Sequence, residues 1–254
     1  MKKTRMTRLL ITVLTLLSAT NALAQEKYYF TSEELPNAVI WLPAPPDTTS
    51  TRYVYDITQY MWGKTQRLDS LRAQMAVNHA VTDPAEMAYY FSEAFGMPIS
   101  EETTPAIIKM LSKAIPTIRL SATYPKNAYM RKRPYVRFNE PTLIPEEEDE
   151  LRDTGSYPSG HTVRGWGMAL LLCEINPEAQ DAILKLGYEW GQSRVIAGFH
   201  WQSDVDASRS LAAACYARLH SSQEFLADMA AARKEYTHLV EYKNFRKPVS
   251  SLRK

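Results

Sequence analysis

The chain has 254 residues, of which 45% are hydrophobic and 23% charged, and its formal net charge at pH 7 is +2. This length fits one large domain or two small ones. Its only cysteines, Cys173 and Cys215, are too few for a thiolate metal site, and they could form one disulfide or remain two buried thiols.

Residues 1–24 have the features of a cleaved secretory signal. A basic start is followed by an apolar run from Leu9 to Leu17 and by the small-x-small pattern Ala22-Leu23-Ala24. The apolar run is too short for a stable transmembrane helix, which disfavours an uncleaved anchor. We therefore expect an exported mature chain that starts near Gln25.

Removal of this signal changes the charge balance. The signal carries four of the 30 basic residues, Lys2, Lys3, Arg5 and Arg8, and no acidic residue. The rest of the chain has 26 basic against 28 acidic residues, a net charge of −2. This excludes the global positive field that is typical of nucleic-acid-binding proteins.

The two ends of the mature chain differ in composition from the part between them. Residues 25–50 contain four prolines, so we expect an extended arm lying on the core. Residues 241–254 are basic, and we expect a solvated or disordered tail. Between them apolar residues recur with helical spacing and strand-like alternation is nearly absent, which predicts a single all-α domain over residues 51–240.

Apolar positions and prolines delimit the helices of the first half. Two helical faces are predicted, one formed by Tyr53, Ile57, Tyr60 and Met61 and the next by Leu68, Leu71 and Met75. Asp83-Pro84 predicts a helix start with proline in the first turn. A longer helix is expected over residues 104–122, where Pro116 should cause a kink or a break.

The second half is also predicted to be helical. The segment 165–173 is apolar almost all round, which is typical of a buried helix. Asn176-Pro177 should end it and start the next helix, with the asparagine as cap. Two further helices are expected over residues 203–219 and 225–239.

The segment that joins these halves is strongly acidic. Residues 146–150 are all Glu or Asp and lie between prolines and a glycine. One interpretation is a solvated loop, because a run of like charges is usually exposed. The other is a mobile flap near a functional site, because the run ends shortly before Pro158.

Three cations could hold a phosphate group. Lys126 and Arg133 stand in the spacing Lys-x6-Arg-Pro, and Arg194 follows Ser193. A phosphate monoester carries one to two negative charges, and an arginine can donate to two of its oxygens in one plane. Each residue alone would be an ordinary surface cation, so the role depends on their placement in ordered motifs.

Ser159-Gly160 precedes the predicted buried helix and allows two interpretations. Glycine lets the backbone approach a ligand closely, and the N–H groups at a helix start point toward an anion. The serine hydroxyl could donate one more bond to a phosphate. The alternative is an ordinary helix cap formed by Ser159.

His200 and Asp204 are four residues apart. In a helix they would share a face, and the carboxylate could accept from one ring nitrogen and leave the other free to attack. The alternative is an aspartate at a helix start beside an unrelated histidine. His161 fits a general acid that protonates the leaving alcohol, and this division of roles is easiest at acid pH. The remaining histidines, expected at the surface or at helix ends, are His79, His220 and His238.

In order, the motifs read Lys-x6-Arg-Pro, Pro-Ser-Gly-His and Ser-Arg-x5-His-x3-Asp, and the chain matches every specified position. The sequence therefore resembles the bacterial class A nonspecific acid phosphatases. Their superfamily also holds the type 2 phosphatidate phosphatases and the vanadium haloperoxidases. The resemblance covers about residues 126–219 well and is weaker in the helices before them.

This resemblance implies a helical bundle with the site at one end and a phosphohistidine intermediate formed without metal or cofactor. His200 would be the nucleophile, Asp204 would orient it and His161 would be the general acid. The phosphate ligands that the resemblance implies are Lys126, Arg133, Ser159, Gly160 and Arg194. It further implies a periplasmic homo-oligomer that hydrolyses small soluble phosphomonoesters, or transfers the phosphate where a hydroxyl replaces water.

Three alternative functions are open to the same motifs. A lipid-phosphate phosphatase usually spans the membrane, and the mature sequence has no apolar run approaching ~20 residues. A vanadium haloperoxidase would hold vanadate in the same site, but the chain is short for one. A non-catalytic phosphate-binding protein would need the cations but not His161 together with a His200–Asp204 pair.

Overall fold

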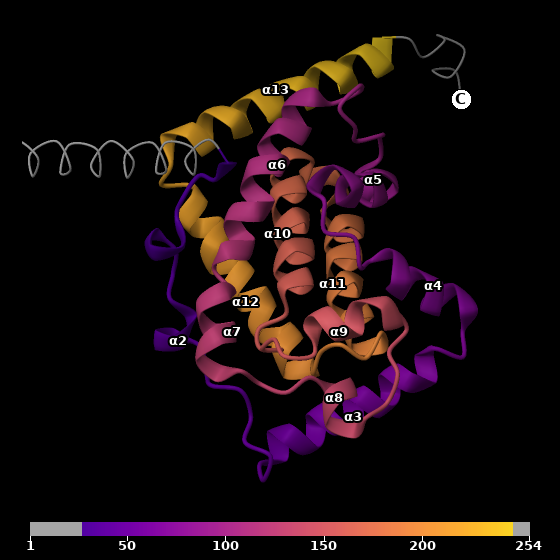
Figure 1. Ribbon diagram of the computed structural model, residues 1–254. Helices are drawn as coiled ribbons and strands as arrows, with labels where there is room; N and C mark the ends of the chain where they lie inside the picture. Colours follow the sequence, from indigo (N-terminus) through magenta and orange to yellow (C-terminus); the bar gives the residue numbers. More distant parts are fainter. Residues whose placement is uncertain (1–26, 246–254) are drawn as a thin grey trace, which may run out of the picture.

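The computed structural model describes residues 27–245, which form a bundle of helices around α10 (Figure 1). α10 (Gly160–Ile175) packs against α11 (Gln180–Ile196), α12 (Gln202–Leu219) and α6 (Pro105–Leu120). No strand occurs in this part of the chain, so the all-α prediction is confirmed.

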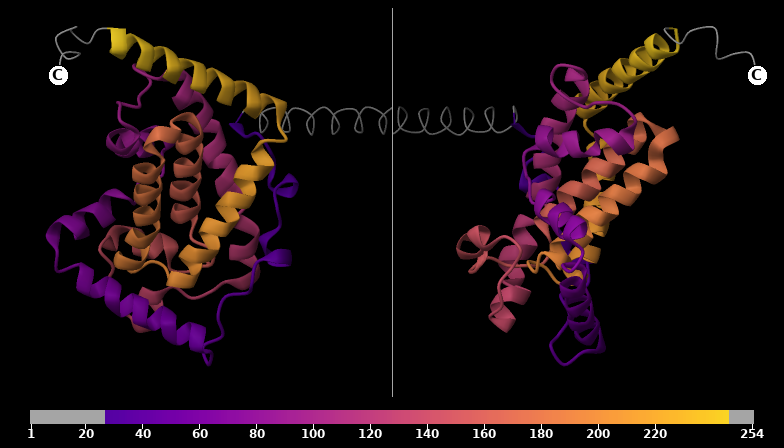
Figure 2. Two further views of the ribbon diagram at one scale, coloured as in Figure 1. Left: turned by 180° about the vertical axis from the view of Figure 1, so that it is seen from behind. Right: turned by 90° about the vertical axis from the view of Figure 1, so that its right-hand side faces the viewer.

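Two long helices lie across the ends of the bundle (Figure 2). α13 (Gln223–Phe245) crosses one end and packs against α6, and α3 (Thr51–Gln66) crosses the other and packs against α11 and α12. The shorter elements are η1 (Ser32–Glu34), α2 (Ala38–Trp41), α4 (Ser70–Asn78), α5 (Pro84–Phe95), α7 (Thr123–Tyr129), α8 (Pro134–Phe138), η2 (Pro145–Glu147), α9 (Glu148–Leu151) and η3 (Pro177–Ala179). Of these, α7, α8 and α9 lie at the same end as α3 (Figure 1).

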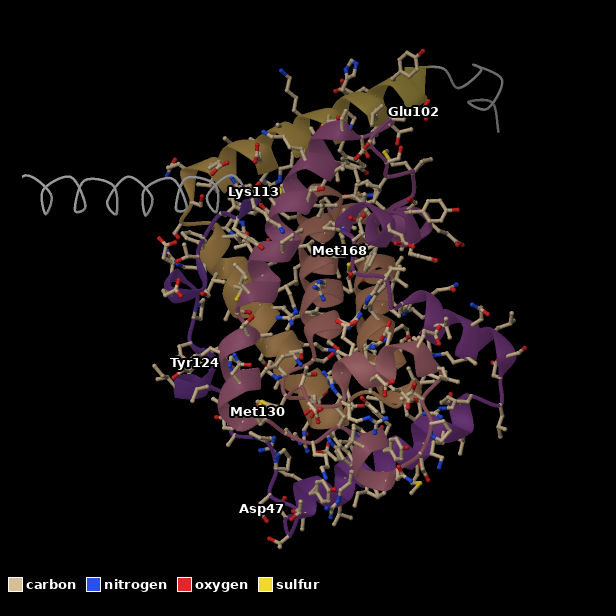
Figure 3. All side chains as sticks on the ribbon, in the orientation of Figure 1. Asp47, Glu102, Lys113, Tyr124, Met130 and Met168 are labelled. Atoms are coloured by element: carbon tan, nitrogen blue, oxygen red, sulfur yellow. The ribbon has the colours of Figure 1, made fainter. Side chains whose placement is uncertain are left out.

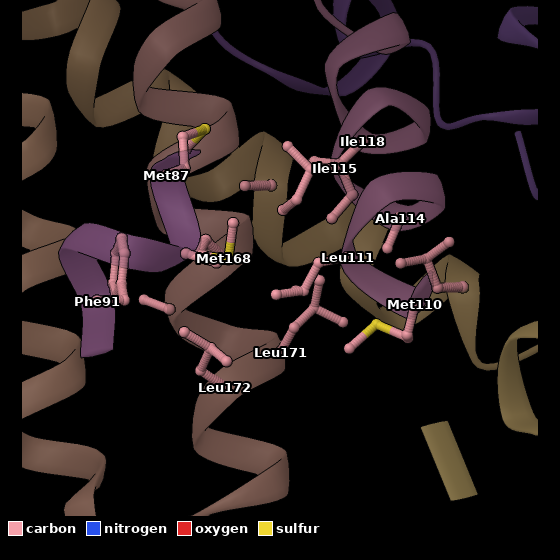
Figure 4. Packing of buried hydrophobic residues seen from close by; sticks show 14 of the residues in the cluster. Met87, Phe91, Met110, Leu111, Ala114, Ile115, Ile118, Met168, Leu171 and Leu172 are labelled. Carbon is pink, nitrogen blue, oxygen red and sulfur yellow. The ribbon is translucent and has the colours of Figure 1, made fainter. Parts of the chain in front are cut away.

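Apolar side chains of α5, α6 and α10 meet in the middle of the bundle (Figure 4). Met168 and Leu171 of α10 are fully buried in one cluster with Leu111 and Ile115 of α6, and we call this cluster the apolar core. Met168 lies midway along the bundle, whereas Met130 lies toward the end that carries α3 (Figure 3). Burial of a side chain of this size contributes about 1.5–3 kcal/mol, so the apolar core is the main source of stability.

Two helix predictions for the first half meet different outcomes. Asp83 caps α5 by accepting from the N–H groups of Ala85 and Glu86, and Pro84 lies in the first turn, as expected. Pro116, however, does not break α6, which continues to Leu120. The carbonyl that loses its helical partner belongs to Ser112, on the exposed face, where water can satisfy it.

The face predicted for Leu68, Leu71 and Met75 is wrong. Leu68 is 89% and Leu71 82% exposed, and only Met75 is half-buried. Asp69 decides this, because its carboxylate accepts from the N–H groups of Leu71 and Arg72 and starts α4 at Ser70. Apolar spacing therefore did not identify the buried side of this short helix.

The second half follows the predicted helices with two differences. Asn176 ends α10, but its side chain donates to the carbonyl of Phe95 (2.8 Å) instead of capping the next helix. The last helix is longer than expected and extends to Phe245. Cys173 and Cys215 are free thiols, the first half-buried and the second buried. The predicted signal and most of the predicted tail lie outside the described residues.

Residues 27–50 lie on the bundle and contain short helical turns as well as extended segments. The N–H of Tyr29 donates to Thr117 Oγ1 (2.9 Å), and its hydroxyl donates to Asp228 (2.7 Å). The Tyr157 hydroxyl donates to the carbonyl of Pro43 (2.6 Å). These bonds fix the arm to α6, to α13 and to the segment that precedes α10.

Candidate active site

The starts of α10 and α12 and the end of α11 lie at the same end of the bundle (Figure 1), and most of the predicted site residues belong to these segments or to the loops beside them. Gly160 is the first residue of α10 and is buried. Ser159 caps the helix, because its Oγ accepts from Thr162 N (3.3 Å) and from Thr162 Oγ1 (2.9 Å). The cap interpretation is therefore correct, yet it leaves the hydroxyl proton of Ser159 available for a phosphate oxygen.

His200 is 2% exposed and contacts a carboxylate on one side and an arginine on the other. Its Nδ1 lies 3.3 Å from Asp204 Oδ2, and its Nε2 lies 3.1 Å from Arg133 Nη1. An arginine can only donate, so Nε2 accepts and the ring proton belongs on Nδ1. In this tautomer Nε2 keeps the lone pair that a nucleophile needs.

The pair is not arranged as two residues on one helical face. α12 begins at Gln202, so His200 lies in the loop before it and Asp204 in the first turn. Asp204 Oδ2 also accepts from Trp201 N (2.9 Å), which caps the helix. Asp204 is thus both a helix-start aspartate and a partner of His200, and the two interpretations hold together.

Arg131 contacts the Asp204 carboxylate from its other side and is itself paired with Asp56, and sequence reasoning missed both residues. Arg131 Nη1 donates to Asp204 Oδ1 (2.5 Å), and Nη2 donates to Asp56 Oδ2 (2.7 Å). Asp56 in turn accepts from the Ser203 backbone N–H (2.8 Å). Two signals could have found them: Arg131 lies inside the Lys-x6-Arg spacing, and Asp56 lies on the apolar face of Tyr53 and Tyr60.

Three predicted cations surround this pair. Lys126 Nζ donates to the carbonyl of Gly155 (2.7 Å), which also lies 3.4 Å from Arg133 Nη2. Arg194 is fully buried, and among residues 27–245 its Nε and Nη1 have no hydrogen-bond partner. Buried donors of this kind are rare, and a tetrahedral oxyanion is well suited to satisfy them.

The third guanidinium nitrogen of Arg194, Nη2, contacts the acidic segment. Arg194 Nη2 lies 3.1 Å from Glu147 Oε2. Glu148 accepts from Thr142 N (2.7 Å), and its carbonyl accepts from the Tyr135 hydroxyl (2.6 Å). The solvated-loop interpretation therefore holds only for the exposed residues Glu146, Asp149 and Glu150, because the segment forms η2 and α9 over Arg194.

His161 is partly buried one residue after Gly160. Its Nε2 lies 2.8 Å from the carbonyl of Ala80, so Nε2 carries a proton and donates it there. Burial, followed by the charges of Arg194 and Arg164, lowers the pKa of His161 well below 6.5. Burial and the charge of Arg133 lower the pKa of His200 in the same direction. Both rings are therefore neutral at pH 7 until an anion offsets the cations.

The remaining histidines lie at helix ends or at the surface, as expected, but one of them is also buried. His79 ends α4 as predicted, but it is only 2% exposed and stacks on Trp190 with ring centroids 4.2 Å apart. Its Nδ1 lies 2.9 Å from Ser193 Oγ, directly before Arg194 in the chain. His220 ends α12 and His238 is exposed on α13, as expected.

A separate surface cavity of about 890 Å³ lies between α3, α4, α5 and α11. It is lined by Trp62, Tyr90 and Tyr188 together with Arg72, and it contains none of the predicted site residues. Within the described ranges, no group of three or more His, Cys, Asp or Glu side chains gathers closely enough to hold a metal ion. None of the helices between residues 27 and 245 is both long and apolar enough to cross a membrane.

Several known proteins are similar in sequence to this chain over most of its length. The PAP2 superfamily profile matches residues 106–226. The chain is 43% identical to the non-specific acid phosphatase of Providencia stuartii over 84% of this chain and 86% of that protein. It is 40% identical to the non-specific acid phosphatase of Salmonella typhimurium over 82% and 83% of the two chains, and 34% identical to the acid phosphatase of Zymomonas mobilis over 82% and 77%. The chain therefore belongs to the bacterial non-specific acid phosphatases of the PAP2 superfamily.

Proposed function

We propose that this phosphatase hydrolyses small soluble phosphomonoesters, such as nucleotides and sugar or aryl phosphates, through a phosphohistidine on His200 and without a metal ion. One observation carries the proposal. His200 presents an unprotonated Nε2 among cations while Asp204 holds the proton on Nδ1. A neutral imidazole in this setting is a nucleophile for phosphorus.

The first half of the reaction forms the phosphoenzyme. Lys126, Arg133 and Arg194 bind the non-bridging oxygens together with Ser159 and the first N–H groups of α10, and Arg133 moves its bond from Nε2 to the phosphate. His200 Nε2 then attacks phosphorus, and the ester P–O bond breaks. His161 gives its proton to the leaving oxygen, and Asp204 stabilises the positive charge that develops on His200.

The second half regenerates the enzyme. His161, now neutral, takes a proton from water, whose oxygen attacks phosphorus as the N–P bond breaks. Inorganic phosphate leaves, and His200 is again neutral with its proton on Nδ1. If an alcohol takes the place of water, the phosphate is transferred to that alcohol instead.

We further propose that the enzyme is exported to the periplasm through the signal at residues 1–24, with a mature start near Gln25, and that it forms a homo-oligomer. The basic, apolar and small-x-small succession of the first residues supports export. A soluble substrate fits the mature sequence, which contains no apolar run approaching ~20 residues.

Replacement of the nucleophile tests the mechanism. His200→Ala should lower kcat/KM for p-nitrophenyl phosphate by about 10³-fold or more, and a rapid-quench experiment should find no acid-labile phosphoenzyme. His238→Ala, on the exposed surface of α13, is the control and should keep parental activity. Activity of His200→Ala within a few fold of the parent contradicts the mechanism, and loss of activity on removal of metals with a chelator contradicts metal independence.

A further inference from the structure

We propose that Arg119 of α6 and Arg164 of α10 form a second anion-binding site, which receives a second phosphate group carried by the leaving group of the substrate. The inference rests on the proposed function, since it needs the first phosphate to be held at His200. It predicts a preference for bisphosphorylated substrates over monophosphates of the same skeleton.

Arg119 lies directly against the start of α10. A Cβ placed on Gly160 would lie only 2.6 Å from Arg119 Nε and 3.2 Å from its Cζ. The guanidinium therefore covers the Cα of the residue whose N–H belongs to the phosphate site. Glycine leaves room for this position of Arg119, because a Cβ at residue 160 would force the guanidinium to move.

Arg164 lies one turn further along α10 on the same side as Gly160. Residues four apart share a helical face, and side chains lean toward the N-terminus of a helix. The guanidinium of Arg164 is thereby directed back toward Gly160 and Arg119. Burial, and next the charge of Arg119, lower the pKa of Arg164 to about 10, and the charge of Arg164 in turn contributes to the lowered pKa of His161.

Neither arginine has a counter-charge within residues 27–245. Arg119 makes one long hydrogen bond, from Nη1 to Thr123 Oγ1 (3.4 Å), and its buried Nε has no partner. Arg164 makes no hydrogen bond or ion pair in the described part of the protein, whereas Arg131 and Arg194 contact carboxylates. Partly buried cations without partners are destabilising, so a bound anion would be the missing partner.

The position of Arg164 indicates which part of the substrate it meets. It follows His161 by three residues on α10, and His161 is the proposed proton donor to the leaving oxygen. The pair therefore lies on the leaving-group side, while Lys126, Arg133 and Arg194 hold the transferred phosphate. A phosphate on the leaving group would gain charge-assisted bonds that a neutral alcohol cannot form.

The test compares α,ω-alkanediol bisphosphates of two to six carbons with the corresponding monophosphates at 150 mM salt. In the parent enzyme, kcat/KM for the best bisphosphate should exceed that for its monophosphate by about tenfold, the effect of one good charge-assisted contact. The double variant Arg119→Gln/Arg164→Gln should reduce this ratio to about one to two, and the ratio is the readout because a change in the chemical step affects both substrates alike. Arg233→Gln on α13, an exposed arginine paired with Glu174, should leave the ratio unchanged.

A binding measurement separates this inference from the mechanism. Calorimetry with non-hydrolysable alkane bisphosphonates and alkylphosphonates should show a bisphosphonate preference in the parent and in His200→Ala, and none in the double variant. Equal binding of the two ligands by the parent overturns the second site. The second site is also overturned if the bisphosphonate preference survives in the double variant, or if Arg233→Gln loses it to the same extent. Full activity of His200→Ala overturns the phosphohistidine alone.

Discussion

The two halves of α10 lie in opposite surroundings. Its later turns, with Met168 and Leu171, are buried in the apolar core, whereas its first turn lies among cations and carboxylates. We call the latter region the charged end; its members include Asp56, Lys126, Arg131, Arg133, Arg194, His200 and Asp204. Apolar burial is non-directional and depends on volume, while the charged end depends on individual contacts.

This difference means that the later turns of α10 contribute mainly to stability and its first turn mainly to the chemistry of the site. A buried ion pair contributes little net stability, because desolvation offsets most of the attraction. Loss of one partner is nevertheless costly, since it leaves an uncompensated buried charge. We therefore expect substitutions in the apolar core to change the free energy of unfolding and substitutions at the charged end to change kcat.

Among substitutions that leave His200 in place, Asp204→Asn should have the largest effect. The amide keeps the shape of the carboxylate but cannot stabilise the charge that develops on His200, and it can favour the wrong ring tautomer. We expect kcat to fall by about 10²–10⁴-fold, by analogy with aspartate–histidine pairs in hydrolases. Steady-state kinetics with p-nitrophenyl phosphate measure this, and a fall of less than about tenfold would remove Asp204 from the mechanism.

Leu171→Ala, in the apolar core, should change the stability of the protein and not its activity. Removal of this fully buried side chain should lower the free energy of unfolding by about 2–5 kcal/mol and leave kcat/KM within about twofold. Urea denaturation followed by circular dichroism measures the first quantity. Leu68→Ala, 89% exposed, is the matched control and should change stability by less than about 0.5 kcal/mol. Equal effects of the two variants would contradict the assignment of the core.

Arg131→Gln tests whether Arg131 acts by orienting Asp204 at the charged end. Arg131 contacts Asp204 and Asp56 but none of the proposed phosphate ligands. We expect kcat to fall about 10–100-fold with KM changed by less than about threefold, as is usual when a group that orients a catalytic residue is removed. A rise in KM with unchanged kcat would instead assign Arg131 to substrate binding.

The lowered pKa values of both histidines predict an acid pH optimum for the proposed mechanism. That mechanism requires a neutral His200 and a protonated His161, and burial and neighbouring cations lower the pKa of each below 6.5. Protonation of His161 is therefore lost already as the pH rises toward neutrality, while His200 stays neutral to lower pH than usual. The kcat/KM profile should be bell-shaped with its maximum below pH 6.5, and the high-pH limb should weaken in His161→Ala. A maximum at or above pH 7 would contradict this assignment.

Glu147→Gln should give the smallest change. Its carboxylate contacts Arg194 Nη2 and so competes with a phosphate oxygen for that donor. Removal of the charge should lower KM and the inhibition constant of inorganic phosphate by about three- to tenfold, in the range of one charge-assisted bond. Glu150→Gln, in the same acidic segment but exposed, should leave both constants unchanged. An increase in KM for Glu147→Gln would mean that the contact supports binding instead.

Sequence reasoning succeeded where a local pattern carries the physical cause. The buried helix over 165–173 and the proline start at Pro84 were predictable, because apolar periodicity and fixed proline geometry act within one segment. Two of the unpredicted contacts involve partners that are distant in sequence. Asn176 bonds to Phe95, and Glu147 bonds to Arg194. No local pattern indicates such contacts.

By itself, the sequence determined that the protein is helical and that eight residues in three motifs could bind and cleave a phosphate ester. The tertiary structure decided which atoms of those residues contact one another, because hydrogen bonds depend on distance and direction across the bundle. It places the ring proton of His200 on Nδ1, adds Arg131 and Asp56 behind Asp204, and brings Arg119 of α6 against Gly160 of α10. The spacing of the motifs identifies which charged residues are involved. Only the packing of α3, α6, α10 and α12 determines which of them contact one another.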